Sequence, residues 1–292
     1  MSEEISQEFA QVTETVRKRA RELLESGEVA VFVGWEMGRF EHQRTPLICL
    51  DAADTDRLVF DEWCANNLAK YATDLKARGK VGLCVRGCDS RAVNRLIADN
   101  QLDRGDVHLV GLPCPQIRDG KTGAVLNKCK ACRHRNPVVS DELACDEVEE
   151  TPPEDRWDQA TIVSAMERVA RQDFFNDAWS KCLRCYACRN VCPCCTCRIC
   201  FVDQRAVGWL GKENNLTENR FYGLIRAFHI SDRCIECGEC ERVCPMNLPL
   251  MALNRKLVQD MNELFGEYES GVGEGRPDAL HTYSTDDIEE FM

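Results

Sequence analysis

The sequence predicts an α/β domain with a parallel sheet and helical crossovers, followed by a cysteine-rich domain of a different kind. Three observations support this division. Over residues 1–140, short apolar runs alternate with helical patterns, as in parallel sheets whose strands are joined by helices. An acidic segment containing two adjacent prolines follows at residues 141–158. Twelve of the twenty cysteines lie after that segment.

The first domain is expected to begin with a long helix over residues 3–25. Gly27 ends it, because glycine readily adopts the left-handed conformation that commonly follows a helix. The hydrophobic period of each later segment predicts its type. Strands are expected over residues 29–33, 81–85 and 107–111, and helices over residues 61–78 and 90–100.

Nine acidic residues, one arginine and two prolines at residues 141–158 indicate a solvated linker. A helix is expected over residues 157–180, and Pro249 opens a last amphipathic helix. After Gly266 the sequence is rich in glycine and acidic residues, which predicts a tail without a packed fold. The expected organisation is an α/β domain at 1–140, a linker at 141–158, a second domain at 159–266 and an acidic tail at 267–292.

Composition limits the classes of function. The chain has 292 residues, 20 cysteines and a formal net charge of −12. Nucleic-acid binding is not expected, because contact with phosphates needs a basic surface. Neither a membrane span nor a signal peptide is expected, since no apolar run near the start is long enough. We therefore expect a cytoplasmic protein, whose clustered cysteines serve as metal ligands or catalytic groups and not as disulfides.

The strongest chemical signal is a pair of matching runs of the form Cys-x2-Cys-x2-Cys-x3-Cys-Pro. This spacing lets one tight loop supply three thiolates to a 4Fe–4S cluster, while the fourth cysteine ligates the other cluster. Zinc is the alternative, but it prefers two separated Cys-x2-Cys pairs. The fold class expected for this half is a ferredoxin-like α+β domain that holds two clusters and carries a helical insertion. The expected ligands are Cys182, Cys185, Cys188 and Cys244 for cluster I, and Cys234, Cys237, Cys240 and Cys192 for cluster II.

An insertion separates the two runs, since Cys192 and Cys234 are 42 positions apart. It begins with four cysteines in seven residues, which is too dense for all of them to face a core. Cys195, Cys197 and Cys200 are candidate ligands of a further cluster or metal, with another ligand from elsewhere. The alternative is that they only fill space around cluster I.

The first domain carries a further candidate set. Cys88 follows the strand expected over residues 81–85, and Cys114 follows the strand expected over residues 107–111. In a parallel sheet both lie at the carboxyl edge, where ligands bind in open α/β folds. Together with Cys129 and Cys132, which basic residues flank, they predict a third 4Fe–4S cluster; zinc or inert thiols are the alternatives. The remaining cysteines receive no ligand role: core positions are expected for Cys49 and Cys84, and nothing is predicted for Cys64 and Cys145.

Segments around these cysteines resemble known families. Residues 85–92 (VRGCDSRA), 111–114 (GLPC) and 128–132 (KCKAC) resemble the beta-subunit family of deazaflavin-dependent hydrogenases and dehydrogenases. That resemblance implies a cluster next to a flavin (FAD) that exchanges hydride with a deazaflavin, although the sequence has no G-x-G-x-x-G loop. Residues 229–267, with CIECGECERVCP at 234–245, resemble the iron–sulfur subunits that accompany heterodisulfide reductase, formate dehydrogenase and hydrogenase modules in anaerobes.

Two classes of function follow. In the first, the chain is an iron–sulfur electron-transfer subunit of an anaerobic multi-subunit oxidoreductase complex, with other redox subunits of these kinds as partners. In the second, the first domain binds flavin and exchanges hydride with a deazaflavin or nicotinamide cofactor. The first is favoured, because no acid–base or nucleophile site can be recognised and no catalytic residue is assigned.

Overall fold

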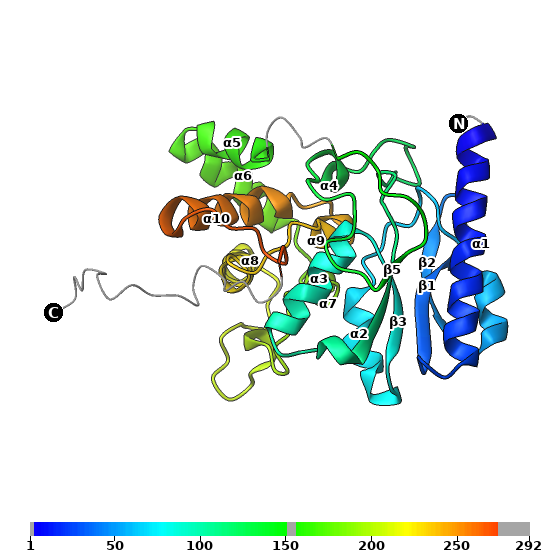
Figure 1. Cartoon of the computed structure of the whole chain (residues 1–292). Helices are drawn as coiled ribbons and strands as arrows, with labels where there is room; N and C mark the ends of the chain where they lie inside the picture. Colours follow the sequence, from blue (N-terminus) through cyan, green and yellow to red (C-terminus); the bar gives the residue numbers. More distant parts are fainter. Residues whose placement is uncertain (1–2, 151–155, 274–292) are drawn as a thin grey trace.

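The computed structural model describes residues 3–150 and 156–273 (Figure 1). Its first part is built on a five-stranded sheet with the strand order β2-β1-β3-β4-β5. β1, β3, β4 and β5 are parallel neighbours, and β2 pairs antiparallel with β1 at the edge. This arrangement confirms the α/β class. The strands are β1 Val31–Met37, β2 Arg44–Cys49, β3 Val81–Val85, β4 Val107–Gly111 and β5 Glu142–Leu143.

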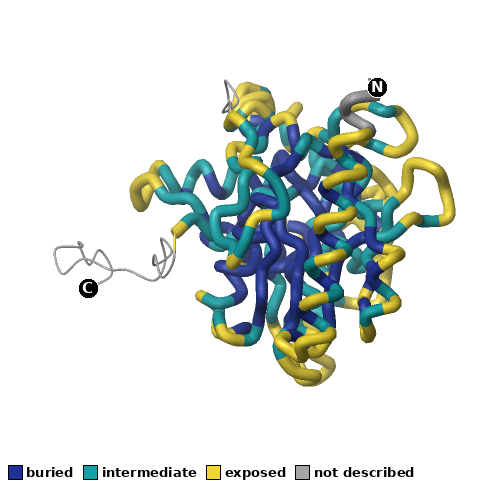
Figure 2. The backbone as a smooth tube through the Cα atoms, turned by 45° about the vertical axis from the view of Figure 1, so that its right-hand side comes forward, coloured by how far each residue is buried: buried dark blue, intermediate teal, exposed yellow. Residues whose placement is uncertain are grey.

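Helices flank the sheet on two sides. In Figure 1, the long helix α1 (Glu3–Glu25) lies to the right of the sheet, and α2 (Ala69–Leu75) and α3 (Gly87–Ala98) lie to its left. Every residue of β3 and β4 is buried, as expected of central parallel strands. Buried residues fill the centre of the molecule, and exposed residues follow its outer loops (Figure 2). Short segments complete this part: η1 Ala52–Arg57, η2 Lys76–Arg78, η3 Arg104–Asp106 and α4 Asn127–Lys130.

Some predicted bounds were wrong for local reasons. The helix expected over residues 61–78 begins only at Ala69, because side chains hold the preceding segment in turns. The Asp61 carboxylate accepts from the Trp63 N–H at 2.9 Å, and the side-chain oxygen of Asn67 accepts from the Ala69 N–H at 3.1 Å. α3 begins three residues earlier than predicted, β1 is shifted towards residue 37, and β2 was not predicted.

The second part is helical. The helix expected over residues 157–180 is two helices, because the backbone at Met166 is extended (φ −69°, ψ 141°). The insertion between the cysteine runs contributes α8, in agreement with the predicted helical insertion. Among residues 156–273 no strand is assigned, so the α+β part of the prediction is not confirmed. The elements are α5 Asp158–Ala165, α6 Arg168–Ser180, α7 Ala187–Asn190, η4 Phe201–Asp203, α8 Leu216–His229, α9 Glu239–Arg242 and α10 Leu250–Phe265.

The two parts share a hydrophobic core. Cys192, Cys194, Ile230 and Ile235 belong to the same buried cluster as the strands of the sheet. The segment predicted as a solvated linker begins as β5 at the edge of the sheet, and the Asp141 carboxylate accepts from the Leu109 N–H at 2.7 Å. The first residues of that segment are therefore hydrogen-bonded to the sheet, while the domain boundaries themselves stay a prediction.

The start of the predicted acidic tail also packs on the first part. The guanidinium of Arg91 in α3 donates to the Ser270 carbonyl at 2.9 and 3.1 Å and lies 3.5 Å from the Glu269 carboxylate. Residues 274–292 of the predicted tail lie outside the described residues. None of the helices in the described ranges combines the length and the apolarity that crossing a membrane requires.

Candidate metal centres

The four cysteines predicted for cluster I line one cavity, although Cys244 lies 56 positions after Cys188 in the sequence. Cys182 and Cys185 lie in the segment before α7, and Cys188 lies in α7 itself. Cys244 lies two residues after the end of α9. Trp179, Tyr222 and Leu250 lie on the apolar walls. The predicted set is therefore brought together: Cys182, Cys185, Cys188 and Cys244.

The four cysteines predicted for cluster II also lie together, in the interior. Cys192 is among the charged groups that most strongly affect the pKa values of Cys234, Cys237 and Cys240, although it belongs to the other run. Burial raises the pKa of Cys234 and of Cys240 to about 12. The pKa of Cys192 instead falls well below its usual value, because its sulfur lies within hydrogen-bonding range of the Cys194 and Cys195 side chains. Cys192 therefore lies beside the second run, and the exchange of fourth ligands stays a prediction.

The two cysteine runs have the same backbone conformation. Arg184 and Glu236 occupy equivalent positions, and both have positive φ (48° and 57°). Two residues later Tyr186 and Gly238 are also left-handed, with φ 59° and 65°, and each is followed by a four-residue helix. In this conformation the Arg184 N–H donates to the Cys182 sulfur at 3.4 Å. A left-handed backbone conformation is unfavourable for residues other than glycine. Its repetition at equivalent positions of both loops therefore indicates that the two loops serve the same purpose.

Two side chains outside the cysteine runs reach the sulfur atoms. The Tyr222 hydroxyl on α8 lies 3.3 Å from the Cys188 sulfur, and the Asn254 amide on α10 donates to the Cys240 sulfur at 3.5 Å. Neither residue was identified from the sequence. The only available signal was the helical pattern of the segments that carry them.

The third predicted set also lines one cavity, at the carboxyl edge of the sheet. Cys88 lies in the first turn of α3, Cys114 follows β4, and Cys129 and Cys132 lie in and after α4. Burial raises the pKa of Cys114 to about 12. The walls also carry basic side chains, which would stabilise an anionic group: Arg86, Arg91, Lys128 and Arg133.

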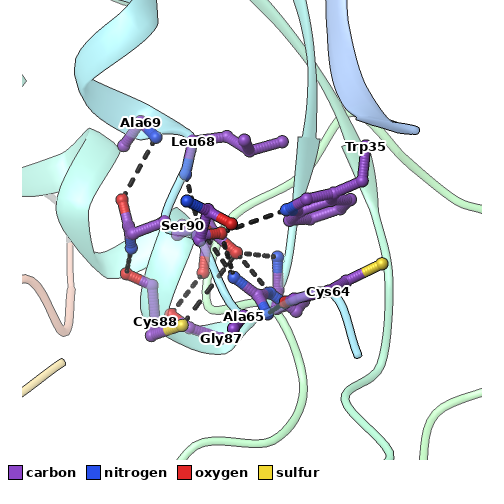
Figure 3. A network of polar contacts seen from close by, with 12 residues as sticks. Trp35, Cys64, Ala65, Leu68, Ala69, Gly87, Cys88 and Ser90 are labelled. Atoms are coloured by element: carbon purple, nitrogen blue, oxygen red, sulfur yellow. Dashed lines mark hydrogen bonds and ion pairs between the residues drawn. The ribbon is translucent and has the colours of Figure 1, made fainter. Parts of the chain in front are cut away.

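A buried network fixes the turn that carries Cys88 (Figure 3). The Arg86 guanidinium pairs with the Asp89 carboxylate at 2.7 Å, and both side chains are almost fully buried. Asp89 also accepts from the backbone N–H of Arg86 and of Leu68, at 3.1 and 2.8 Å. Arg86 lies over the Trp35 ring, 4.7 Å from its centroid. The network joins β1, the segment before α2 and the start of α3, so it holds Cys88 on a rigid support.

The cysteines of the insertion line a further cavity with Lys70, Arg189 and Arg226. Cys194 is buried and donates to the Arg233 carbonyl at 3.0 Å, and Cys197 is exposed. Within the described ranges, no three His, Cys, Asp or Glu side chains are set as they would be around a single metal ion. The candidates on this cavity are Cys195, Cys197 and Cys200. Of the other cysteines, Cys49 and Cys84 lie in the core as predicted, Cys64 is buried and Cys145 is half-buried.

The three four-cysteine sets are neighbours. Cys237 of the second set also lines the cavity of the third. Cys188 of the first set is among the charges that affect Cys240 of the second. From the sheet edge towards α8, the cysteine sets therefore follow one another in the order third, second and first.

Comparisons with known proteins agree with this site. Residues 227–248, which contain Cys234, Cys237, Cys240 and Cys244, match the model of the 4Fe-4S binding domain. The chain is 38% identical over 101 residues to F420-dependent formate dehydrogenase subunit beta of Methanocaldococcus jannaschii, covering 34% of this chain and 25% of that protein. It is 36% identical over 108 residues to F420-dependent formate dehydrogenase 1 subunit beta of Methanococcus maripaludis, covering 36% and 26%.

The matches thus span about a quarter of the length of these curated relatives. They confirm the resemblance to formate dehydrogenase beta subunits over about a third of this chain, together with a 4Fe–4S binding segment at the second cysteine run.

Proposed function

We propose that this chain is an iron–sulfur electron-transfer subunit of an anaerobic oxidoreductase complex. The observation that carries the proposal is the grouping of twelve cysteines into three neighbouring sets of four, two of which overlap the matched 4Fe-4S binding segment. Other redox subunits, of the formate dehydrogenase, heterodisulfide reductase or hydrogenase kind, would supply and accept the electrons.

The residues present fit 4Fe–4S clusters. Each set offers four thiols, which is the ligand number of a cubane, and N–H or O–H groups lie near the sulfur atoms in the first two sets. Arg226, beside the first two sets, has a buried Nε without a hydrogen-bond partner, as expected where an anionic group belongs. When bound, such clusters accept and release single electrons at potentials that the surrounding charges and hydrogen bonds set.

The chain's own residues would position three clusters in a row. Burial of Cys192, Cys234 and Cys240 excludes water from the second set, whereas Cys185 of the first set is exposed. The third set opens at the sheet edge, as ligand sites in α/β folds do. We propose that electrons pass along this row, and that the exposed first set lies at the exit to a partner.

Analysis of anaerobically purified protein for iron, sulfide, zinc and flavin tests the proposal. Two clusters correspond to about 8 iron atoms per chain, three to about 12, and a further cluster at the insertion to about 16. About 12 irons with matching sulfide is the expected result. A chain that carries stoichiometric zinc and no sulfide would contradict the proposal.

A second candidate function rests on the two relatives, which are named as F420-dependent formate dehydrogenase subunits. In it the first domain binds FAD next to the third set and exchanges hydride with a deazaflavin or nicotinamide cofactor. The absorbance spectrum of the purified protein separates the two functions. Stoichiometric flavin, reducible by the deazaflavin, supports the second function, and its absence after purification with full iron content supports the first.

A further inference from the structure

Arg226 is an unusual buried cation. It lies on α8, in the insertion between the two cysteine runs, and its relative exposure is 5%. It lines the cavity of the first cysteine set as well as the cavity at the insertion. Its Nη2 donates to the Cys188 carbonyl at 3.1 Å, while its buried Nε has no partner.

Thiols dominate the surroundings of this guanidinium. Other buried arginines pair with a carboxylate, as Arg86 does with Asp89 at 2.7 Å. Among the described residues, Arg226 pairs with no carboxylate, and the cavities it lines carry Cys182, Cys185 and Cys188 of the first set and Cys195 of the insertion. Its main electrostatic neighbours belong to both ferredoxin-type sets and to the insertion: Cys240, Cys192, Cys195 and Cys188.

A guanidinium that is buried without an anion is strongly unfavourable, so this position requires negative charge beside it. Thiolate-ligated 4Fe–4S clusters are anionic, and each becomes more negative on reduction. A fixed positive charge therefore stabilises the reduced form more than the oxidised form, which raises the reduction potential.

We propose that Arg226 is the shared counter-charge of clusters I and II, and that it raises the reduction potentials of both. The inference rests on the proposed function, because it requires both clusters to be bound. It also gives the insertion a role. The 42-position separation of Cys192 and Cys234 makes room for α8, and α8 supplies Arg226 together with the Tyr222 hydroxyl beside Cys188.

EPR-monitored redox titration of the anaerobically purified full chain tests the inference, using Arg226→Gln, Arg226→Lys and Arg220→Gln. Arg220 is the matched control, because it lies on the same helix but lines neither cavity. We expect Arg226→Gln to shift the midpoint potentials of clusters I and II downwards and to leave the third cluster unchanged. Arg226→Lys keeps the charge and should shift both potentials less, and Arg220→Gln should shift neither.

The inference is overturned if Arg226→Gln keeps its iron and its potentials match those of the unmodified chain, or if all three clusters shift equally. If Arg226→Gln does not retain its clusters, the midpoint potentials of Arg226→Lys decide. Midpoint potentials of Arg226→Lys near those of the unmodified chain support Arg226 as the counter-charge. A large fall in these potentials, although lysine retains the charge, contradicts it. A failure of the proposed function is recognised separately, because the unmodified chain would then lack the signals of clusters I and II.

Discussion

Neutralising Glu239 should destabilise the contact between the two parts of the chain. The Glu239 side chain is fully buried on α9 and pairs with Lys128, which lines the cavity of the third cysteine set. Arg242 donates to the same carboxylate at 2.7 and 2.9 Å. Burial alone would raise the pKa of Glu239, but Lys128 and Arg242 more than offset this effect and lower it from 4.5 to about 2.

That lowering corresponds to about 3.5 kcal/mol of folding free energy, at about 1.4 kcal/mol per pKa unit. The figure agrees with the ~3–5 kcal/mol lost when one member of a buried ion pair is removed. We therefore expect Glu239→Gln to lower the apparent Tm by roughly 6–10 °C in anaerobic thermal scans at a fixed heating rate. The depressed pKa also sets the pH dependence. The stabilisation is complete above about pH 4.5 and is lost as the pH falls towards 2, so the variant should lack that part of the acid transition.

Glu241 on the same helix is the matched control. Burial raises its pKa, so its charge opposes folding as the pH rises, and its carboxylate accepts from the Met251 N–H at 2.8 Å. Glutamine keeps an acceptor oxygen there, and Glu241→Gln should change stability by less than about 1 kcal/mol. If Glu239→Gln matches this control in Tm and in acid sensitivity, the reasoning about the buried pair is refuted.

Three further predictions concern the cysteine sets and their supporting loops. Cys192→Ser should damage the cluster assigned to Cys234, Cys237 and Cys240 and spare the other; EPR showing loss of the Cys182 cluster alone would contradict the exchanged fourth ligand. Alanine at any one of Cys88, Cys114, Cys129 or Cys132 should lower iron by about four atoms per chain, because a cubane that lacks a thiolate is labile; unchanged iron would make these thiols structural. Gly238→Ala should lower the Tm more than Gly27→Ala. Both glycines have positive φ, but a Cβ at Gly238 would collide with the Lys128 side chain, whereas a Cβ at Gly27 would meet open space. Equal losses of Tm would exclude the collision with Lys128 as the cause.

The sequence predicted those parts of the site that local spacing determines. The cysteine runs form equivalent loops because their ligand spacing and left-handed residues lie within seven positions. The third set could be predicted because parallel strands end at one edge, which brings Cys88 and Cys114 together.

Features that depend on tertiary contacts were missed. β2 contains Pro46 and mixed polarity, and it is a strand because it pairs with β1. β5 lies in an acidic segment, whose charge is compensated by ion pairs such as Glu142 with Arg19 at 2.6 Å. Arg226 is one arginine among many in the sequence, and only the packing of α8 against the first cysteine set and the insertion distinguishes it.

The central claim is that three clusters lie in a row and exchange electrons within one chain. EPR of the stepwise-reduced, anaerobically purified protein tests it most directly. The proposal predicts that the integrated EPR signal of the fully reduced protein corresponds to about three unpaired electrons per chain. It also predicts that the signal of each 4Fe–4S cluster broadens as its neighbours are reduced. A fully reduced protein with a single isolated signal, or with none, would contradict it.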